Sequence, residues 1–182
     1  MRESRINIIG ASGVGKTTLA KALAEKLNFP HFDTDHYYHL LTDPPFQKQR
    51  SSEDRLALVT KDLGGNSSWV LSGAVAGWQP EPKLDYSLVV LLYLSPEIRL
   101  ERLRQRELRL YGSRILPGGD MESDHQFFMD WSSGYDSGMC EGTNTLPNHE
   151  AFVGRVTCPT IRIGNAITTE EQLRLVLDAI NA

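Results

Sequence analysis

The sequence has few cysteines and no excess of basic residues. Its two cysteines, Cys140 and Cys158, have no CxxC spacing and no histidine at ligand spacing. This pattern indicates reduced thiols of a cytoplasmic protein rather than a disulfide framework or a zinc site. The formal net charge of -4 at pH 7 argues against the basic surface that binds nucleic acids or anionic membranes. We therefore expect neither as a partner.

Long apolar runs, internal repeats and low-complexity tracts are also missing. The first apolar run ends at Gly10 and is too short for a signal segment or a membrane span. The 182 residues, of which 40% are hydrophobic, suffice for one core but not for two comfortable ones. We expect a single domain over 1–182, as a monomer or homodimer.

Short apolar runs alternate with segments of helical periodicity. The apolar runs predict strands at 6–9, 29–32, 69–71, 88–94 and 160–163. The periodic segments predict helices at 16–27, 53–63, 96–110 and 168–180. Such alternation is typical of an α/β fold in which helices cover both faces of a parallel sheet. Polar residues that follow the strands should meet at one edge of that sheet.

The stretch 111–150 is rich in glycine and proline and shows no clear period. A segment of this kind predicts a functional flap or a mobile loop rather than core. Its aromatic residues have two interpretations: they pack the flap against the core, or they line an acceptor pocket. These residues are Tyr111, Phe127, Phe128, Trp131 and Tyr135.

A complete G-x-x-x-x-G-K-T motif follows the first strand and opens the first helix. The glycines let successive main-chain N–H groups point at phosphates, and the helix N-terminus adds its positive dipole end. Lys16 supplies a charge near the β- and γ-phosphates, and the Thr17 hydroxyl is a ligand for Mg²⁺. The predicted nucleotide-binding residues are Gly10, Ala11, Ser12, Gly13, Val14, Gly15, Lys16, Thr17 and Thr18.

The carboxylates that accompany this P-loop must come from outside the fourth strand. No guanine-reading N-K-x-D occurs, and the run 88–94 ends in Ser95-Pro96 without an acid. Asp33 and Asp35 follow the second strand and are two residues apart, so in an extended segment both face the same side. One is suited to a Mg²⁺ site and the other to accepting a proton from an attacking hydroxyl. The alternative is a solvated turn or a cap on a helix that starts at His36.

Arginines are concentrated between residues 99 and 114. Arg102 and Arg106 are four apart and so share one helix face. Forked guanidinium groups match the charge that spreads over a transferring phosphoryl group. The alternative is a solvated helix in which arginines such as Arg99 and Arg104 pair with neighbouring glutamates.

Together these motifs resemble the nucleoside-monophosphate-kinase-like branch of P-loop kinases, which includes adenylate, shikimate and gluconate kinases. Asp33-Thr34-Asp35 is similar to the D-x-D of shikimate kinases, and Arg102 to Arg106 resembles the R-x-x-x-R of adenylate kinases. The resemblance implies Mg²⁺ at Thr17 and Asp33, and an acceptor hydroxyl at Asp35. It also implies adenine stacking by Arg102 and catalysis by Lys16, Asp35 and Arg106.

The resemblance further implies a three-layer P-loop NTPase fold with a five-stranded parallel sheet. It carries a helical substrate-binding insert near 36–66 and a flexible lid near 107–145. Two departures leave the acceptor open. Where shikimate kinases have three glycines, this sequence has Ser72-Gly73-Ala74, and only Arg50 or Arg55 could match the arginines that bind the carboxylate of their substrate. The D-G-[FY]-P-R motif of adenylate kinases is missing.

These features predict an ATP- and Mg²⁺-dependent kinase whose partner is a small-molecule acceptor. The alternative is a nucleotide-gated switch, in which slow ATP hydrolysis changes the flap and the affinity for a protein partner. The paired acids, the arginine-bearing flap and the lack of a recognisable docking segment favour the kinase.

Overall fold

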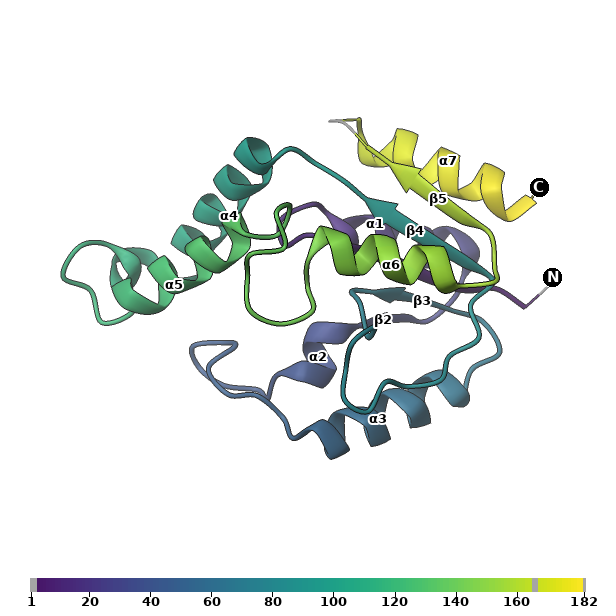
Figure 1. The fold of residues 1–182 in the computed structure, drawn as a ribbon, viewed down its shortest axis with the longest axis horizontal. Coiled ribbons are helices and arrows are strands. Elements are labelled where there is room, and N and C mark those ends of the chain that lie inside the picture. The colour runs from purple at the N-terminus through teal and green to yellow at the C-terminus, as the bar shows by residue number, and fades with distance from the viewer. Residues whose placement is uncertain (1–2, 165–166, 182) are drawn as a thin grey trace.

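A computed structural model describes residues 3–164 and 167–181 of the chain. Its centre is one sheet of five parallel strands in the order β2-β3-β1-β4-β5 (Figure 1). The strands are β1 (Arg5–Gly10), β2 (His31–Asp33), β3 (Trp69–Ser72), β4 (Leu88–Leu92) and β5 (Thr160–Ile163). The prediction of a five-stranded parallel sheet is confirmed, with strand ends within a few residues of those expected.

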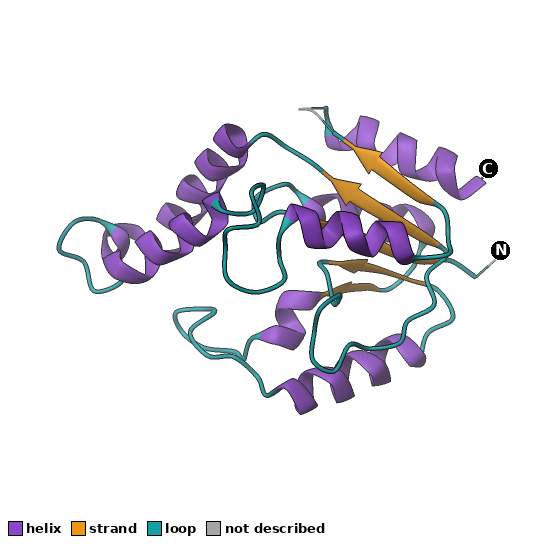
Figure 2. Ribbon diagram, in the orientation of Figure 1, coloured by secondary structure: helices purple, strands orange, loops and turns teal. Residues whose placement is uncertain are grey.

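Helices cover both faces of this sheet, so the fold has three layers (Figure 2). The α-helices are α1 (Lys16–Leu27), α2 (Thr34–Tyr38), α3 (Ser52–Gly64), α4 (Pro96–Tyr111), α5 (Glu122–Ser133), α6 (Leu146–Arg155) and α7 (Thr169–Asn181), and a 3₁₀ turn, η1, spans Gly112–Ile115. The capping box predicted at Thr168 and Glu171 is present, with each side chain bonded to the other residue's main-chain N–H.

Alternation along β1 explains the layers. Ile6 and Ile8 face one side and pack with α1 and α7, whereas Ile9 faces the other side and packs with Phe152 and Val153 of α6. Near β3, the same second face is covered by α3. The central strand is therefore buried on both sides, as an apolar parallel strand requires.

The flap prediction for 111–150 is wrong in one respect, because this stretch contains two helices, α5 and the start of α6. Tyr111, Met129 and Tyr135 are buried, whereas Phe127 is exposed. Polar residues interrupt the apolar positions of both helices, and this hides their period. Tertiary contacts, rather than a regular apolar stripe, keep these helices in place.

The long connection from β3 to β4, residues 73–87, contains no helix. The face that it leaves uncovered is instead packed by α6, which follows much later in the chain (Figure 1). The N-terminus of α6 lies toward the same edge of the sheet as the carboxyl ends of the strands (Figure 2). The helix that follows the predicted lid thereby borders the edge where the P-loop lies.

Arg99 of α4 is fully buried rather than solvated, so the alternative of a solvated arginine helix is wrong at this position. Its guanidinium donates to the Ser132 carbonyl at 2.7 Å and pairs with Asp136. These contacts fix the end of α5 against α4. Within the described ranges, no helix is both long enough and apolar enough to cross a membrane.

Candidate active site

The P-loop connects β1 to α1, and its glycines are sterically required. Gly10 and Gly13 have φ angles of 144° and 79°, which disfavour other residues. A Cβ atom on Gly10 would lie 2.4 Å from the Leu92 carbonyl oxygen, and one on Gly13 would lie 2.7 Å from that of Arg99. The loop is thus pressed against β4 and α4.

Lys16 is the first residue of α1, and its charge interacts with three other charged groups. Its Nζ donates to the Ala11 carbonyl oxygen at 2.8 Å. Burial lowers the pKa of Lys16, the carboxylates of Asp35 and Asp33 oppose this shift, and Arg106 adds to it. The structure therefore brings together four residues that the sequence analysis assigned to one site.

Asp33 ends β2 and accepts three hydrogen bonds. Its Oδ2 atom accepts from Thr17 Oγ1 and from Ser72 Oγ, each at 2.8 Å. Its Oδ1 atom accepts from the Asp35 main-chain N–H at 3.0 Å. The hydrogen bond from Thr17 places the carboxylate of Asp33, the predicted Mg²⁺ ligand, directly against the P-loop helix.

The local geometry of the two acids differs from the extended segment that we expected. The strand stops at Asp33, which caps α2, and Asp35 lies in the first turn of that helix. A helix therefore starts just after Asp33, close to the start at His36 that the alternative proposed. The cap uses one carboxylate oxygen and Thr17 the other, so the cap is present, and the metal and proton-acceptor roles of the two acids stay predictions. Asp35 itself is exposed.

The two lid arginines are placed differently. Arg106 pairs with Glu107 at 3.3 Å and lies over the Phe128 ring, 5.5 Å from its centroid. Its charge also contributes to the lowered pKa of Lys16. Arg102 is exposed one turn earlier on α4. The structure thus links Arg106 to the P-loop electrostatically, and the role of Arg102 stays a prediction.

Ser72 was expected at the same edge of the sheet as Asp33 but was given no role, and His31 was not identified as a candidate. Ser72 ends β3 and is 1% exposed, and its Oγ lies 3.0 Å from His31 Nε2. Burial lowers the pKa of His31, and the negative charge of Asp33 opposes this shift. The two-residue spacing of His31 and Asp33 was the feature of the sequence that could have indicated that their side chains lie on the same side of the strand. The pairing with Ser72 depends on strand register, which the sequence does not reveal.

The donor set beside the P-loop fits Mg²⁺ bound with a nucleotide. Thr17 supplies a hydroxyl and Asp33 a carboxylate, which are oxygen ligands of the kind that Mg²⁺ prefers. In the described parts of the chain, no group of three or more His, Cys, Asp or Glu side chains forms a metal cage. Mg²⁺ does not need one, because substrate phosphates and water complete its coordination.

An aromatic and cationic cluster lies beyond Asp35, where α2, α3 and the segment after β3 meet. The Arg55 guanidinium lies 4.2 Å from the Tyr38 ring centroid and 5.5 Å from that of Trp78. Burial lowers the pKa of His39, Asp35 opposes this shift and Arg55 adds to it. The buried Nε of Arg55 has no hydrogen-bond partner among the described residues.

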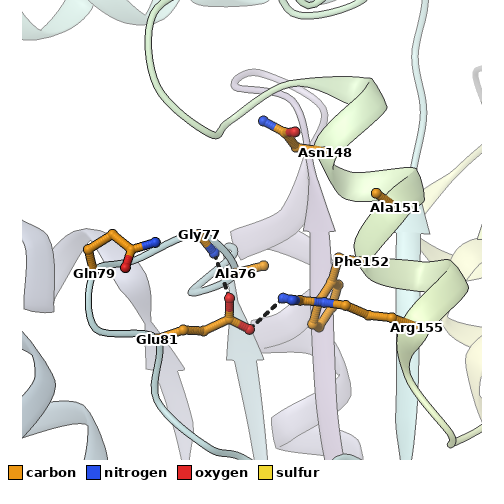
Figure 3. A pocket seen from close by; sticks show the side chains of 8 residues that line it. All are labelled: Ala76, Gly77, Gln79, Glu81, Asn148, Ala151, Phe152 and Arg155. Carbon is orange, nitrogen blue, oxygen red and sulfur yellow. Dashed lines mark hydrogen bonds and ion pairs between the residues drawn. The ribbon is translucent and has the colours of Figure 1, made fainter.

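A separate cavity of about 280 Å³ lies between α6 and the connection from β3 to β4 (Figure 3). Glu81 accepts a hydrogen bond from the Gly77 N–H and pairs with Arg155 at 2.5 Å. The charges of Glu81 and Arg155 neutralise each other, and this ion pair holds the connection from β3 to β4 against α6. None of the predicted site residues lines it; the lining residues are Ala76, Gly77, Gln79, Glu81, Asn148, Ala151, Phe152 and Arg155.

His149 of α6 is 1% exposed. Its Nδ1 is 2.9 Å from the Tyr135 hydroxyl. Burial and the charge of Lys16 lower the pKa of His149 to about 4. The imidazole is therefore neutral near pH 7, and it joins the end of the predicted lid to the P-loop surroundings.

Known proteins resemble this chain in sequence and in fold. Residues 6–124 match the family described as AAA domain. "Uncharacterized protein YqaC" of Bacillus subtilis (strain 168) is 39% identical over 180 residues, which cover 99% of each chain. A shikimate kinase of Cupriavidus pinatubonensis is 32% identical over 135 residues, 68% of this chain and 70% of that one. The crystal structure of a gluconokinase from Sinorhizobium meliloti 1021 superimposes with a TM-score of 0.53 at 18% identity, covering 99% of this chain and 93% of that one, and supports the fold alone.

The chain therefore belongs to the AAA-domain family of P-loop proteins, and within it to the nucleoside-monophosphate-kinase-like branch. Its relatives support a small-molecule kinase in general terms, and hence a phosphotransferase.

Proposed function

We propose that this protein transfers the γ-phosphoryl group of Mg·ATP to a hydroxyl group of a small metabolite. The observation that carries the proposal is the 2.8 Å contact between Thr17 and Asp33. It joins the P-loop helix to the end of β2, and it supports a role near the phosphate-binding loop for Asp35, which is two residues further on. A second acid near the metal-side carboxylate is suited to accept the proton of an attacking hydroxyl group.

In the proposed reaction, P-loop N–H groups and Lys16 hold the phosphates, and Mg²⁺ held by Thr17 and Asp33 offsets their negative charge. Asp35 accepts the proton of the acceptor hydroxyl as its oxygen forms a bond to the γ-phosphorus. The bond between the γ-phosphorus and the bridging oxygen breaks, and ADP leaves with that oxygen. Arg106 and Lys16 stabilise the charge on the transferring group.

The segments 36–66 and 107–145 are proposed as acceptor-binding insert and lid. Closure of the lid excludes water, which would otherwise accept the phosphoryl group. Arg102 is proposed to stack on the adenine of ATP. The cluster of Arg55, Tyr38 and Trp78 supports an acceptor that carries an anionic group, because a half-buried guanidinium next to two rings is suited to a carboxylate or phosphate.

The test is ADP release from ATP at fixed Mg²⁺, with and without hydroxylated acceptors. The panel contains sugar acids, shikimate, nucleosides and nucleoside monophosphates, together with the neutral analogue of each sugar acid. Release that depends on an anionic acceptor supports the proposal. Release at the same rate with every acceptor and with none contradicts it and favours nucleotide-gated switching, for which ATP-dependent capture of a protein partner is the follow-up.

A further inference from the structure

Three polar side chains meet at one corner of the sheet because of strand register. In the parallel pair β2 and β3, Asp33 is opposite Ser72 and His31 is opposite Val70. His31 and Asp33 are two residues apart on β2, so their side chains point to the same side. Ser72 stands next to both, and it is almost completely buried.

The hydrogen bonds in this corner have a defined direction. Ser72 has one hydroxyl hydrogen, and the nearest acceptor is Asp33 Oδ2 at 2.8 Å, compared with the Phe32 carbonyl oxygen at 3.4 Å. With its hydrogen directed to Asp33, Ser72 Oγ accepts from His31 Nε2 at 3.0 Å. The donor chain therefore runs from His31 through Ser72 to Asp33.

Asp33 is held from three directions as a result. Thr17 and Ser72 donate to Oδ2, and the Asp35 N–H donates to Oδ1. The Asp35 and Thr17 contacts belong to the start of α2 and to the P-loop helix. Ser72 is the side chain that ties Asp33 to the centre of the sheet. It limits rotation of the carboxylate, whose orientation decides whether an oxygen faces the P-loop.

We propose that Ser72 and His31 are positioning residues that orient Asp33 toward the Mg²⁺-nucleotide complex. This inference rests on the function proposed above. Neither residue touches the nucleotide; Ser72 acts through Asp33, and His31 acts through Ser72. Residues that orient a metal-binding carboxylate typically change metal affinity about 10- to 100-fold when they are removed.

The experiment measures ATP binding by calorimetry with Mg²⁺ and with a chelator in its place. Ser72→Ala is expected to reduce the strengthening of binding by Mg²⁺ about tenfold, with metal-free binding unchanged. His31→Ala should have a smaller effect of the same kind. In the double variant, His31→Ala should add nothing, because its effect passes through Ser72.

Two controls separate this role from a general loss of packing. Ser72→Thr keeps the hydroxyl and should restore the effect of Mg²⁺. Ser87→Ala removes a serine hydroxyl at the opposite edge of the same sheet, where it bonds the Arg5 N–H at 2.7 Å. This control variant should bind Mg·ATP as the original protein does.

The unmodified protein provides an independent measurement that does not depend on whether a variant folds. Nitrogen-15 NMR of the neutral His31 ring should show the hydrogen on Nε2, and a hydrogen on Nδ1 would overturn the donor chain. Mg²⁺-dependent binding that is equal in Ser72→Ala and the original protein would overturn the positioning role alone. No effect of Mg²⁺ on ATP binding by the original protein would overturn both this role and the proposed function.

Discussion

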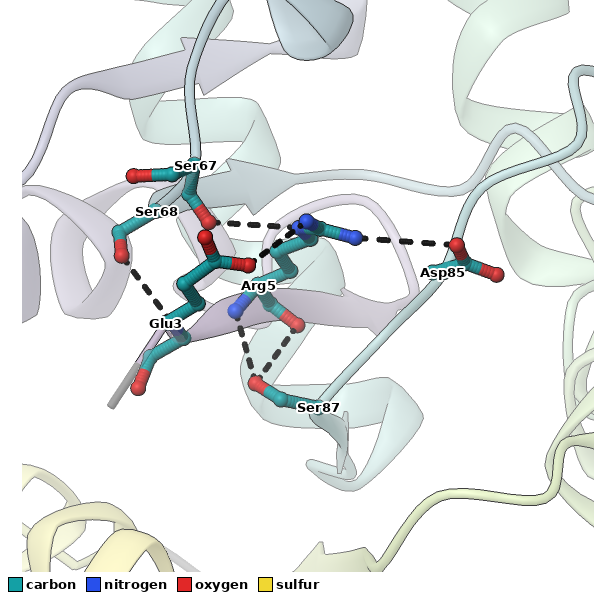
Figure 4. A network of polar contacts seen from close by, with 7 residues as sticks. Glu3, Arg5, Ser67, Ser68, Asp85 and Ser87 are labelled. Atoms are coloured by element: carbon teal, nitrogen blue, oxygen red, sulfur yellow. Dashed lines mark hydrogen bonds and ion pairs between the residues drawn. The ribbon is translucent and has the colours of Figure 1, made fainter.

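The two edges of the central sheet use polar side chains in different ways. At the amino edge, Arg5 of β1 is surrounded by local partners (Figure 4). It pairs with Glu3 at 3.0 Å and with Asp85 at 3.7 Å, and its main-chain N–H donates to Ser87. These contacts join the ends of adjacent strands, and the carboxylates are largely exposed to solvent.

At the carboxyl edge, charges are brought close without being paired one to one. The Lys16 ammonium donates to a main-chain carbonyl, although Asp35 and Asp33 both act on its pKa. Asp33 accepts from hydroxyl and N–H groups rather than from a cation. Ion pairs within the protein satisfy Arg5 at the amino edge, whereas Lys16 and Asp33 at the carboxyl edge make hydrogen bonds to uncharged groups and keep their charges available for a ligand.

The most severe test of this difference is Asp35→Asn. The change removes the proposed proton acceptor but keeps the shape of the side chain, so phosphoryl transfer should fall by about 10²- to 10⁴-fold. ATP binding should be retained, because Asp35 does not contact the nucleotide in the proposed reaction. Transfer rates and calorimetric ATP affinity check this. An equal loss of binding and turnover would make Asp35 a metal ligand instead.

Lys16→Ala tests the cation at the same edge. Transfer should fall by about 10²- to 10³-fold, the usual cost of losing one group that stabilises transition-state charge. The thermal midpoint should not fall, because desolvation lowers the pKa of Lys16, so its charged form does not stabilise the fold. Turnover and thermal unfolding are measured on the same preparation. Unchanged turnover would contradict the whole site assignment.

His149, a buried residue of α6, should make the stability of the protein depend on pH. Its pKa is about 4 in the fold, against an ordinary value of 6.5. The unfolded chain therefore binds more protons between these values, and stability should fall as pH drops from 6.5 toward 4. The loss reaches about 3 kcal/mol, since one pKa unit corresponds to about 1.4 kcal/mol.

The measurement is urea unfolding of the original protein and of His149→Asn at pH 7 and at pH 4.5. The variant should lose clearly less stability between the two pH values, because it has no imidazole to protonate. His36→Asn, at an exposed histidine, controls for loss of a surface imidazole. Equal slopes for the original protein and His149→Asn would show that His149 is not held neutral by the fold.

The sequence was sufficient to predict much of the fold and the centre of the site. The run before Gly10, the G-x-x-x-x-G-K-T motif and the apolar run after Ser87 identify β1, the P-loop and β4, because each is decided by local chemistry. Asp33 and Asp35 were found because they follow a strand. The helix that Asp33 caps was less visible, since five residues are too few to show a period.

Other features could not be predicted because they depend on contacts between distant segments. The sequence around Arg99 is typical of an exposed face of a charged helix, and its burial is explained by Ser132 and Asp136, which are 33 and 37 positions later. Ser72 was expected at the same edge of the sheet as Asp33, but its hydrogen bond to Asp33 depends on the register of two strands that are 39 positions apart in sequence. The helix α6 takes the place of a crossover helix that 73–87 does not form.

The smallest expected effect is that of Arg5→Ala at the amino edge. Ion pairs on the surface typically contribute about 0.2–1 kcal/mol, and both partners of Arg5 are exposed. Urea unfolding should therefore show a loss of less than about 1 kcal/mol, and added salt should reduce the difference further because it screens exposed charges. Turnover should be unchanged. A loss of phosphoryl transfer in this variant would contradict the difference between the two edges, because it would mean that the amino edge also determines the geometry of the site.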